Sequence, residues 1–223
     1  MNPPFPDRHA AGVALAERLV MLAPSDPVVL ALPRGGVPVA VPIARALQAP
    51  LGLLFVRKIG APWQRELAVG AVAGDDATEL LIDERLCAEL GISRSEVERE
   101  AEVQRGEIAR QCRVYLGERP SLPPVSGRSA IVVDDGIATG TTMRAALRAV
   151  RARRPKALLI ATPVASQEAV ALLRAEVDDF VCLAVPRPFR AVGLHYLDFE
   201  AVEDEEVLAC LLERPARAGR FSD

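Results

Sequence analysis

The chain has 223 residues, of which 50% are hydrophobic, 4% are aromatic and 26% are charged, and its formal net charge is -3 at pH 7. A chain of this length can bury a sizeable aliphatic core, and its slightly acidic balance argues against a protein that coats nucleic acid. The four cysteines are far apart and form no CxxC pair, which excludes a disulfide framework and is typical of reduced thiols. With no signal-peptide pattern and no long apolar run, the sequence predicts a cytoplasmic protein without a membrane partner.

The first elements are predicted to be a helix, a buried strand and a glycine loop. Apolar residues at helical spacing predict a helix over 7–22, and the apolar run at 28–32 predicts a strand buried on both faces of a parallel sheet. That strand runs into Pro33-Arg34-Gly35-Gly36-Val37. Glycines at this point let the backbone approach a ligand closely, and Arg34 offers a planar set of donors to an anion. A Gly-Gly pair after a strand is nevertheless more often a simple turn.

Two cations follow the next predicted strand. A helix over 39–47 leads to a strand over 51–56, which ends at Arg57-Lys58. These residues suit an anion, although a solvated pair at a strand end is the ordinary alternative. The segment 61–68, which contains the only tryptophan, precedes a predicted hairpin with strands over 69–73 and 78–82.

Two helices are predicted between this hairpin and the centre of the chain. A short helix covers 83–90, and Ser93-Arg94-Ser95-Glu96 forms a capping box for a long helix that reaches Leu116. Apolar residues are sparse along the long helix, so we expect it to pack along one narrow seam. It is a candidate dimer contact, but its charges are equally typical of a solvated face.

The stretch 130–145 reads Ala-Ile-Val-Val-Asp-Asp-Gly-Ile-Ala-Thr-Gly-Thr-Thr-Met-Arg-Ala and predicts a strand, an acidic turn, a loop of small residues and a helix over 143–153. Backbone N–H groups of the loop 137–142, together with the positive end of the helix dipole, suit a phosphate monoester. Asp134 and Asp135 suit vicinal hydroxyls or a hydrated divalent cation. Phosphate and diol together indicate a ribose 5-phosphate. The alternative is an ordinary strand–loop–helix unit whose acidic pair caps the helix.

The remaining chain continues the alternation of strands and helices. Strands over 157–162 and 180–185 and a helix over 167–175 complete an α/β fold with a doubly wound, mainly parallel sheet, whose ligands bind at the carboxyl ends of the strands. An arginine-rich stripe follows the motif, but it has no interleaved aromatic residues, so nucleic acid is not the expected partner.

The end of the chain interrupts this alternation. Within 186–199, Phe189 and Tyr196 are candidates for stacking on a flat ring, and His195 is better explained as a structural residue than as a catalytic one. A helix over 204–212 and a loose tail over 215–223 complete a single domain, 1–214.

The run Val-Val-Asp-Asp-Gly-Ile-Ala-Thr-Gly-Thr-Thr resembles the phosphoribosyl pyrophosphate (PRPP) binding motif of the type I phosphoribosyltransferases. The resemblance implies that the acidic pair holds the ribose hydroxyls and that the following loop wraps the 5-phosphate. It also places Gly35 and Gly36 in the pyrophosphate loop and directs Lys58, or less favourably Arg57, at the pyrophosphate. The implied catalytic residues are Arg34, Lys58, Asp134 and Asp135, and the implied binding residues are Gly35, Gly36, Asp134, Asp135, Ile137, Ala138, Thr139, Gly140, Thr141 and Thr142.

The same resemblance implies transfer of the phosphoribosyl group to a nitrogenous base, with release of pyrophosphate. Mg²⁺ enters with the pyrophosphate, and Asp134 and Asp135 are its candidate ligands, through water. The partners implied are PRPP and an unidentified base, with a homodimer as an option. A hood over the acceptor is expected from 1–25 and 186–214, and a mobile loop that closes it from 61–68.

One branch of the family is not expected to describe this chain. The 6-oxopurine transferases carry an acidic residue two positions before the glycine of the loop, where this chain has Ala138. Hypoxanthine and guanine are therefore doubtful acceptors. Over most of its length the chain instead resembles a bacterial group of predicted phosphoribosyltransferases of unassigned acceptor. Two alternatives stay open: a PRPP-binding regulator without catalysis, and a hydrolase or phosphorolytic relative that uses the same pocket.

Overall fold

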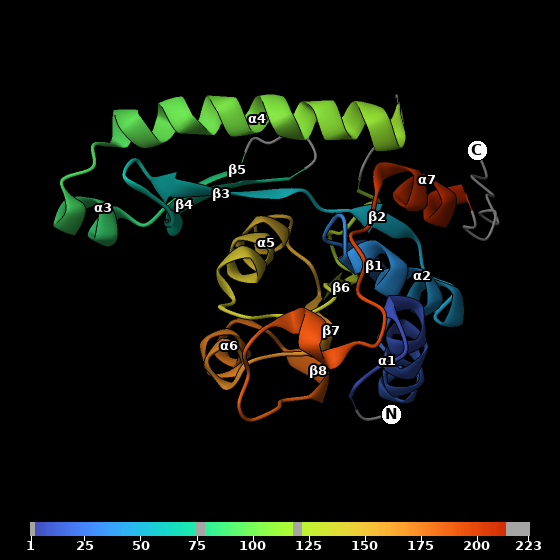
Figure 1. The fold of residues 1–223 in the computed structure, drawn as a ribbon. Helices are drawn as coiled ribbons and strands as arrows, with labels where there is room; N and C mark the ends of the chain where they lie inside the picture. Colours follow the sequence, from blue (N-terminus) through green and yellow to red (C-terminus); the bar gives the residue numbers. More distant parts are fainter. Residues whose placement is uncertain (1–2, 75–78, 118–121, 213–223) are drawn as a thin grey trace, which may run out of the picture.

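The structure is a computed structural model that describes residues 3–74, 79–117 and 122–212. Within them, a five-stranded parallel sheet forms the centre and a three-stranded antiparallel sheet lies beside it (Figure 1). The parallel sheet has the order β2-β1-β6-β7-β8. Its strands are β1 (Pro27–Ala31), β2 (Leu51–Leu53), β6 (Ser129–Val133), β7 (Ala157–Val164) and β8 (Asp179–Ala184).

Helices cover both faces of the parallel sheet. Val29 and Ile131 belong to the core that includes α1 (Arg8–Leu22) and α2 (Gly36–Ala46). The neighbouring residues Val28 and Val132 point the other way and pack with α5 (Thr141–Ala152) and α6 (Gln167–Leu173), which is followed by the 3₁₀-helix η1 (Arg174–Glu176). Because successive strand residues face opposite sides, strands buried on both faces need apolar residues throughout. The predicted doubly wound α/β fold is confirmed.

The strand order reverses between β1 and β6. From β1 the chain moves outward to β2, whereas β6, β7 and β8 continue from the other side of β1. The two strands are in parallel register, with Ala31 opposite Val133, and the N–H of Leu32 donates to the carbonyl of Val133 at 2.9 Å. The loops that leave β1 and β6 therefore begin side by side, at the kind of crevice where open α/β sheets bind ligands.

The antiparallel sheet contains β3 (Val56–Ala61), β4 (Gln64–Ala73) and β5 (Glu79–Ile82) and lies between α4 (Arg94–Leu116) and α5 (Figure 1). The single strand predicted over 51–56 is wrong, because the chain leaves the parallel sheet after Leu53 and enters the other sheet at Val56. The apolar run continues through this crossing, since Leu54 and Phe55 are both buried, in the cores on opposite faces of the parallel sheet. The loop expected over 61–68 is mostly a hairpin of β3 and β4.

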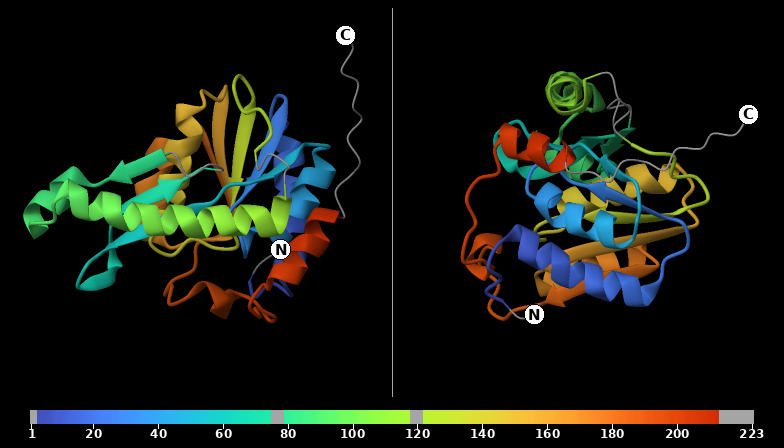
Figure 2. Two further views of the ribbon diagram at one scale, coloured as in Figure 1. Left: turned by 90° about the horizontal axis from the view of Figure 1, so that it is seen from above. Right: turned by 90° about the vertical axis from the view of Figure 1, so that its right-hand side faces the viewer.

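The helices after this sheet agree with the sequence. Asp83 caps α3 (Glu84–Leu90), and Ser93 and Glu96 form both hydrogen bonds of the capping box at the start of α4. Figure 2 shows α4 as a long rod along one side of the molecule. It buries a narrow seam, as predicted, that consists of Val97, Ala101, Ile108, Tyr115 and Leu116.

The first and last described segments meet beside the parallel sheet. The N–H of Phe5 donates to the carbonyl of His195, and the N–H of Leu197 donates to the carbonyl of Phe5, each at 2.8 Å. The segment 189–199 includes the 3₁₀-helix η2 (Val192–His195), whereas α7 (Asp204–Leu212) packs on α2 and α4. That these segments form a hood stays a prediction. Residue 78 of the predicted hairpin and the predicted tail 215–223 lie outside the described residues. Within the part of the chain that the structure describes, no helix is long and apolar enough to cross a membrane.

Candidate functional site

The loops after β1 and β6 are packed so closely that only glycine fits between them. A Cβ atom on Gly36 would lie 2.6 Å from the carbonyl oxygen of Val133, and one on Gly35 would lie 2.1 Å from Oδ2 of Asp135. Real Cβ atoms essentially never make contacts this short. From the sequence, these glycines are predicted to allow a close approach to a ligand; in the structure they allow the approach of the acidic turn. The predicted residues Gly35, Gly36 and Asp135 are thus brought together at the crevice.

The two carboxylates are held in different ways. Oδ1 of Asp134 accepts a hydrogen bond from the N–H of Asp135 at 2.9 Å. Oδ2 of Asp135 accepts from Nε of Arg8 at 2.8 Å, and the backbone carbonyl of Asp135 accepts from the hydroxyl of Tyr196 at 2.5 Å. The acidic turn is therefore tied to the start of α1 and to the segment after η2.

The electrostatics of the pair follow from these contacts. Burial raises the pKa of Asp134 well above its usual value, and the charge of Asp135 raises it further. Burial also raises the pKa of Asp135, but the hydrogen bond and positive charge of Arg8 oppose that rise. Desolvation disfavours a charged carboxylate and a neighbouring cation favours it. Asp135 is consequently the member of the pair whose charge has a partner, while Asp134 is a half-buried acceptor beside it.

The loop 137–142 is anchored on one side and open on the other. The N–H of Ile137 donates to Val164, and its carbonyl accepts from the N–H of Ser166, each at 2.9 Å. The hydroxyl of Ser166 donates to the carbonyl of Ala138 at 2.5 Å. These bonds fix the base of the loop, while Ala138, Thr139, Thr141 and Thr142 are exposed.

The open side of this loop is also the N-terminus of α5. Gly140 precedes the helix with φ of 79°, a left-handed conformation that glycine adopts without strain. No side chain of the described chain caps α5, so the first N–H groups of the helix face outward together with the exposed threonines. Such an N-terminus attracts anions through its N–H groups and its dipole. The predicted loop residues therefore surround a position suited to a phosphate, next to the acidic pair.

A polar cavity of about 380 Å³ adjoins the loop after β1. Arg34 lines it and forms ion pairs with Glu203 at 3.2 Å and Asp204 at 3.6 Å. Arg57 also lines it and pairs with Glu107 of α4 at 3.5 Å. Its remaining lining residues are Pro33, Phe55, Val56, Arg110 and Gln111.

Lys58 is not among the residues that line this cavity. Successive residues of a strand point to opposite faces, so Arg57 and Lys58, both in β3, cannot serve the same side. The structure brings Arg57, the less favoured candidate, to the cavity that Arg34 lines. A pyrophosphate role for Lys58 stays a prediction to which this cavity lends no support.

The aromatic residues near the end of the chain are placed differently from the expectation. Tyr196 is buried, with its ring centroid 5.6 Å from that of Phe5 and 5.0 Å from that of Phe199. Tyr196 is therefore not available to stack on a ligand, and its prediction as a stacking residue is not supported. Phe189 lies beside the ring of His195 with centroids 5.4 Å apart, and Nε2 of His195 is buried without a hydrogen-bond partner among the described residues.

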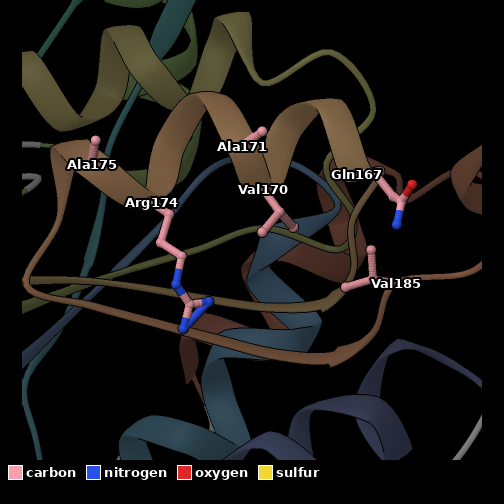
Figure 3. Close-up of a pocket in the computed structure, with 6 residues that line it drawn as sticks. All are labelled: Gln167, Val170, Ala171, Arg174, Ala175 and Val185. Atoms are coloured by element: carbon pink, nitrogen blue, oxygen red, sulfur yellow. The ribbon is translucent and has the colours of Figure 1, made fainter.

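A larger cavity, of about 520 Å³, lies elsewhere and has an apolar lining. Figure 3 shows the side chain of Val170 extending from α6, and that of Arg174 from the adjoining η1, into this cavity, with Val185 on the opposite side. It contains none of the predicted site residues. Its size alone does not make it the site, because the groups suited to a phosphorylated sugar gather at the switch point.

The partners of the site residues carry no signal in the sequence. Arg8 contacts Asp135 from 127 positions away in the chain, and Glu203 contacts Arg34 across 169 positions. Both are ordinary surface-type residues next to helix starts, and no motif marks them. Only the packing of the first and last segments against the sheet places them at the site.

Comparison with known proteins adds an independent line of evidence. Residues 8–197 match the phosphoribosyl transferase domain family. The chain is 42% identical over 207 residues, 93% of its length, to two Mycobacterium tuberculosis proteins named "Putative phosphoribosyl transferase Rv0571c" (strain H37Rv) and "Putative phosphoribosyl transferase MT0597" (strain CDC 1551). The match covers 46% of those proteins, so the chain spans about half the length of the curated relatives it matches.

A solved structure is similar over nearly the whole chain. The crystal structure of TT1426 from Thermus thermophilus has a TM-score of 0.84 and 44% sequence identity, and the match covers 97% of this chain and 100% of that one. Because the match extends over nearly the whole of both chains, the fold described above is shared with an experimentally determined relative.

Proposed function

Because the chain belongs to the type I phosphoribosyltransferase family, we propose that it binds PRPP and transfers the 5-phosphoribosyl group to a nitrogenous acceptor, with release of pyrophosphate. One observation carries this proposal. At the switch point between β1 and β6, a carboxylate pair lies between a glycine loop and the uncapped N-terminus of α5. Carboxylates suit sugar hydroxyls, and the helix N-terminus suits a phosphate.

The residues have distinct roles in this proposal. The N–H groups and hydroxyls of 139–142 bind the 5-phosphate, and Asp134 and Asp135 accept hydrogen bonds from the ribose hydroxyls. Arg34 and Arg57 face the pyrophosphate from the 380 Å³ cavity. The C1–oxygen bond breaks and its electron pair leaves with the pyrophosphate, while the acceptor nitrogen forms the new bond to C1 and releases a proton. Stabilising the departing charge and orienting the reactants supply most of the acceleration.

The donor set is compatible with Mg²⁺. Within the described residues, no group of three or more His, Cys, Asp or Glu side chains is arranged around one metal position. Mg²⁺ usually keeps several waters and binds through one or two carboxylates plus substrate phosphates, and the pair Asp134 and Asp135 fits that pattern. These two residues would hold the ion, through water, and the ion would neutralise charge on the leaving pyrophosphate.

The acceptor is proposed by class alone. Ala138 is exposed at the position where the 6-oxopurine transferases have an acidic residue, so hypoxanthine and guanine are not expected to react. A nitrogenous base is the acceptor that the proposed transfer requires.

The first test is calorimetric titration with PRPP, with and without Mg²⁺, followed by measurement of pyrophosphate release with a panel of bases. Asp134→Asn and Asp135→Asn each replace a carboxylate by a neutral amide of the same shape. We expect each variant to bind PRPP about ten- to hundredfold more weakly and to lose turnover. Asp179→Asn is the matched control, because Asp179 is exposed at the amino end of β8, away from the carboxyl ends of the strands. Undiminished turnover of both variants would contradict the proposal.

The same experiment separates the other functions. Release of free ribose 5-phosphate without any base would indicate a hydrolase, and tight PRPP binding without any turnover would indicate a regulator. Arg57→Ala and Lys58→Ala then identify the cation that serves the leaving group. We expect the Arg57 variant to weaken pyrophosphate binding about three- to tenfold, as a partly exposed charged contact should, and the Lys58 variant to change it less than twofold.

A further inference from the structure

Arg8 makes three contacts that together immobilise its guanidinium. Nε donates to Oδ2 of Asp135 at 2.8 Å, and one terminal nitrogen donates to the backbone carbonyl of Glu200 at 2.8 Å. The guanidinium carbon lies 3.9 Å from the centroid of the Phe199 ring, at cation–π distance. The side chain is 12% exposed, so this is an enclosed arrangement unlike the surface pairs elsewhere on the protein.

Asp135 is enclosed from the other sides as well. Its carboxylate lies against Gly35, where no Cβ atom fits, and its carbonyl accepts from Tyr196. Tyr196 in turn stacks on Phe199, and the guanidinium of Arg8 lies over the same Phe199 ring. The residues around Asp135 thus come from the start of α1, the glycine loop and the segment 196–200, which converge on one carboxylate.

We propose that Arg8 is a positioning residue for recognition of the sugar. It holds one oxygen of Asp135, Oδ2, and thereby presents the other oxygen, Oδ1, to a ribose hydroxyl. This inference rests on the proposed function, because it concerns the ligand of the same site. It adds that the affinity for ribose depends on the contact between the first and last segments of the chain, which lie outside the motif.

The contacts of Arg8 depend on the planar shape of its guanidinium, which donates in two directions and stacks on Phe199. A lysine in this place keeps the positive charge, but it cannot donate in two fixed directions while its plane stacks on Phe199. Loss of the pair leaves a half-buried carboxylate free to rotate, which weakens its bond to a ligand hydroxyl. Arg8 is not part of the proposed phosphate position at the N-terminus of α5. We therefore expect the affinity of the protein for inorganic phosphate to be independent of the Arg8–Asp135 pair.

A contrary role for the same contact predicts the opposite sign. If Arg8 instead occupied the ligand's place on Asp135, its removal would expose the carboxylate and tighten sugar binding. Positioning and blocking are therefore distinguished by the direction of a single affinity change, with inorganic phosphate as the internal reference.

The experiment is calorimetric titration of the full chain with ribose 5-phosphate and with inorganic phosphate, comparing wild type, Arg8→Ala, Arg8→Lys and Arg18→Ala. We expect Arg8→Ala to weaken ribose 5-phosphate binding about ten- to hundredfold, the range for a hydrogen bond to a charged group, and to change phosphate binding less than twofold. Arg8→Lys should recover part of the loss. Arg18→Ala, at an exposed position of the same helix, should change neither affinity.

Each outcome has a definite meaning. Unchanged or tighter ribose 5-phosphate binding by Arg8→Ala, or an equal loss of both ligands in a folded variant, would overturn the positioning role and leave the proposed function standing. If wild type binds no ribose 5-phosphate, both proposals fall. Should Arg8→Ala not fold, Phe199→Leu removes the stacking surface and keeps the arginine, and it should weaken ribose 5-phosphate binding about two- to fivefold with phosphate unaffected; no change would overturn the role.

Discussion

The two sides of the candidate site are built from different materials. The acidic turn and the phosphate loop are fixed mainly by glycine packing, backbone hydrogen bonds and one buried serine, with Arg8 and Tyr196 holding Asp135 from outside the motif. The cavity lined by Arg34 and Arg57 is fixed by ion pairs whose side chains are between 36% and 66% exposed. Backbone packing holds a shape whether or not a ligand is present, whereas exposed ion pairs contribute little stability and rearrange readily.

The difference suits the two ends of the proposed ligand. In the proposed transfer the ribose 5-phosphate end stays bound through the reaction, so a preformed pocket serves it. Pyrophosphate must be held and then released, and carboxylates beside the arginines supply an alternative partner when it has gone. We therefore expect substitutions on the first side to alter the fold and the affinity together, and substitutions on the second side to alter affinity alone.

Gly36→Ala should break the first side most severely. Its Cβ would lie 2.6 Å from the carbonyl oxygen of Val133, an atom of the sheet backbone that cannot move aside cheaply. We expect the free energy of unfolding to fall by about 1–3 kcal/mol, the usual cost of overpacking, with loss of ribose 5-phosphate binding. Chemical denaturation and titration measure the two effects.

Gly106→Ala is the matched control for this substitution. Gly106 is inside α4, where a Cβ atom would meet nothing within 4 Å. Alanine there should stabilise the protein by about 0.4–1 kcal/mol through helix propensity and a less flexible unfolded chain. If Gly36→Ala proved as harmless as this control, the two loops would not be packed as described.

Ser166→Ala tests the anchor of the phosphate loop at smaller cost. Ser166 is buried, caps α6 by accepting from the N–H of Ala169, and donates to the carbonyl of Ala138. We expect a loss of about 1 kcal/mol of stability from the missing cap, and about three- to tenfold weaker binding of inorganic phosphate because the loop loses a hydrogen bond.

Ser93→Ala provides the comparison, since Ser93 caps α4 in the same way but lies far along the chain from the loop. It should cost similar stability and leave phosphate affinity unchanged. Equal phosphate affinities in the two variants would mean that the serine only caps its helix.

The sequence predicts the backbone-built side well for a physical reason. The small residues and the acidic pair directly follow a buried strand, and the parallel register of β1 and β6 brings the loops after these two strands together. The doubly wound sheet, the capping box and the narrow seam of α4 likewise follow from local pattern. Each depends on residues close together in the chain, whose periodicity and chemistry can be read directly.

The side-chain contacts on both sides of the site are predicted poorly, because they join distant segments of the chain. Whether Arg57 or Lys58 faces the cavity depends on which face β3 presents, and that is set by the crossing at Leu54 and Phe55, which the continuous apolar run conceals. The pairing of Arg8 with Asp135 has no local signal. Neither does the burial of Tyr196 against Phe5, which removed it as a stacking surface.

Glu107→Gln sharpens the comparison from the second side, where the expected effect is smallest. Glu107 accepts from Arg110 at 2.7 Å and pairs with Arg57 at 3.5 Å, and it is 37% exposed. The pair with Arg110 lowers the pKa of Glu107 below its usual value, and Arg57 contributes to the same shift. A lowered folded-state pKa adds stability above the unfolded pKa, and this stability is lost as the pH falls through the folded value.

We therefore expect Glu107→Gln to reduce stability at pH 7 by less than about 0.5 kcal/mol, because exposed ion pairs are weak. The difference from wild type should diminish as the pH falls below the unfolded pKa of about 4.3 and vanish below the lowered folded-state pKa of Glu107. Pyrophosphate affinity should rise about two- to threefold, since Arg57 and Arg110 no longer share their charge with a carboxylate, and added salt should diminish the gain. Denaturation across pH and titration at two ionic strengths measure both. A large loss of stability, or weaker pyrophosphate binding, would show that Glu107 supports the cavity instead of competing for its arginines.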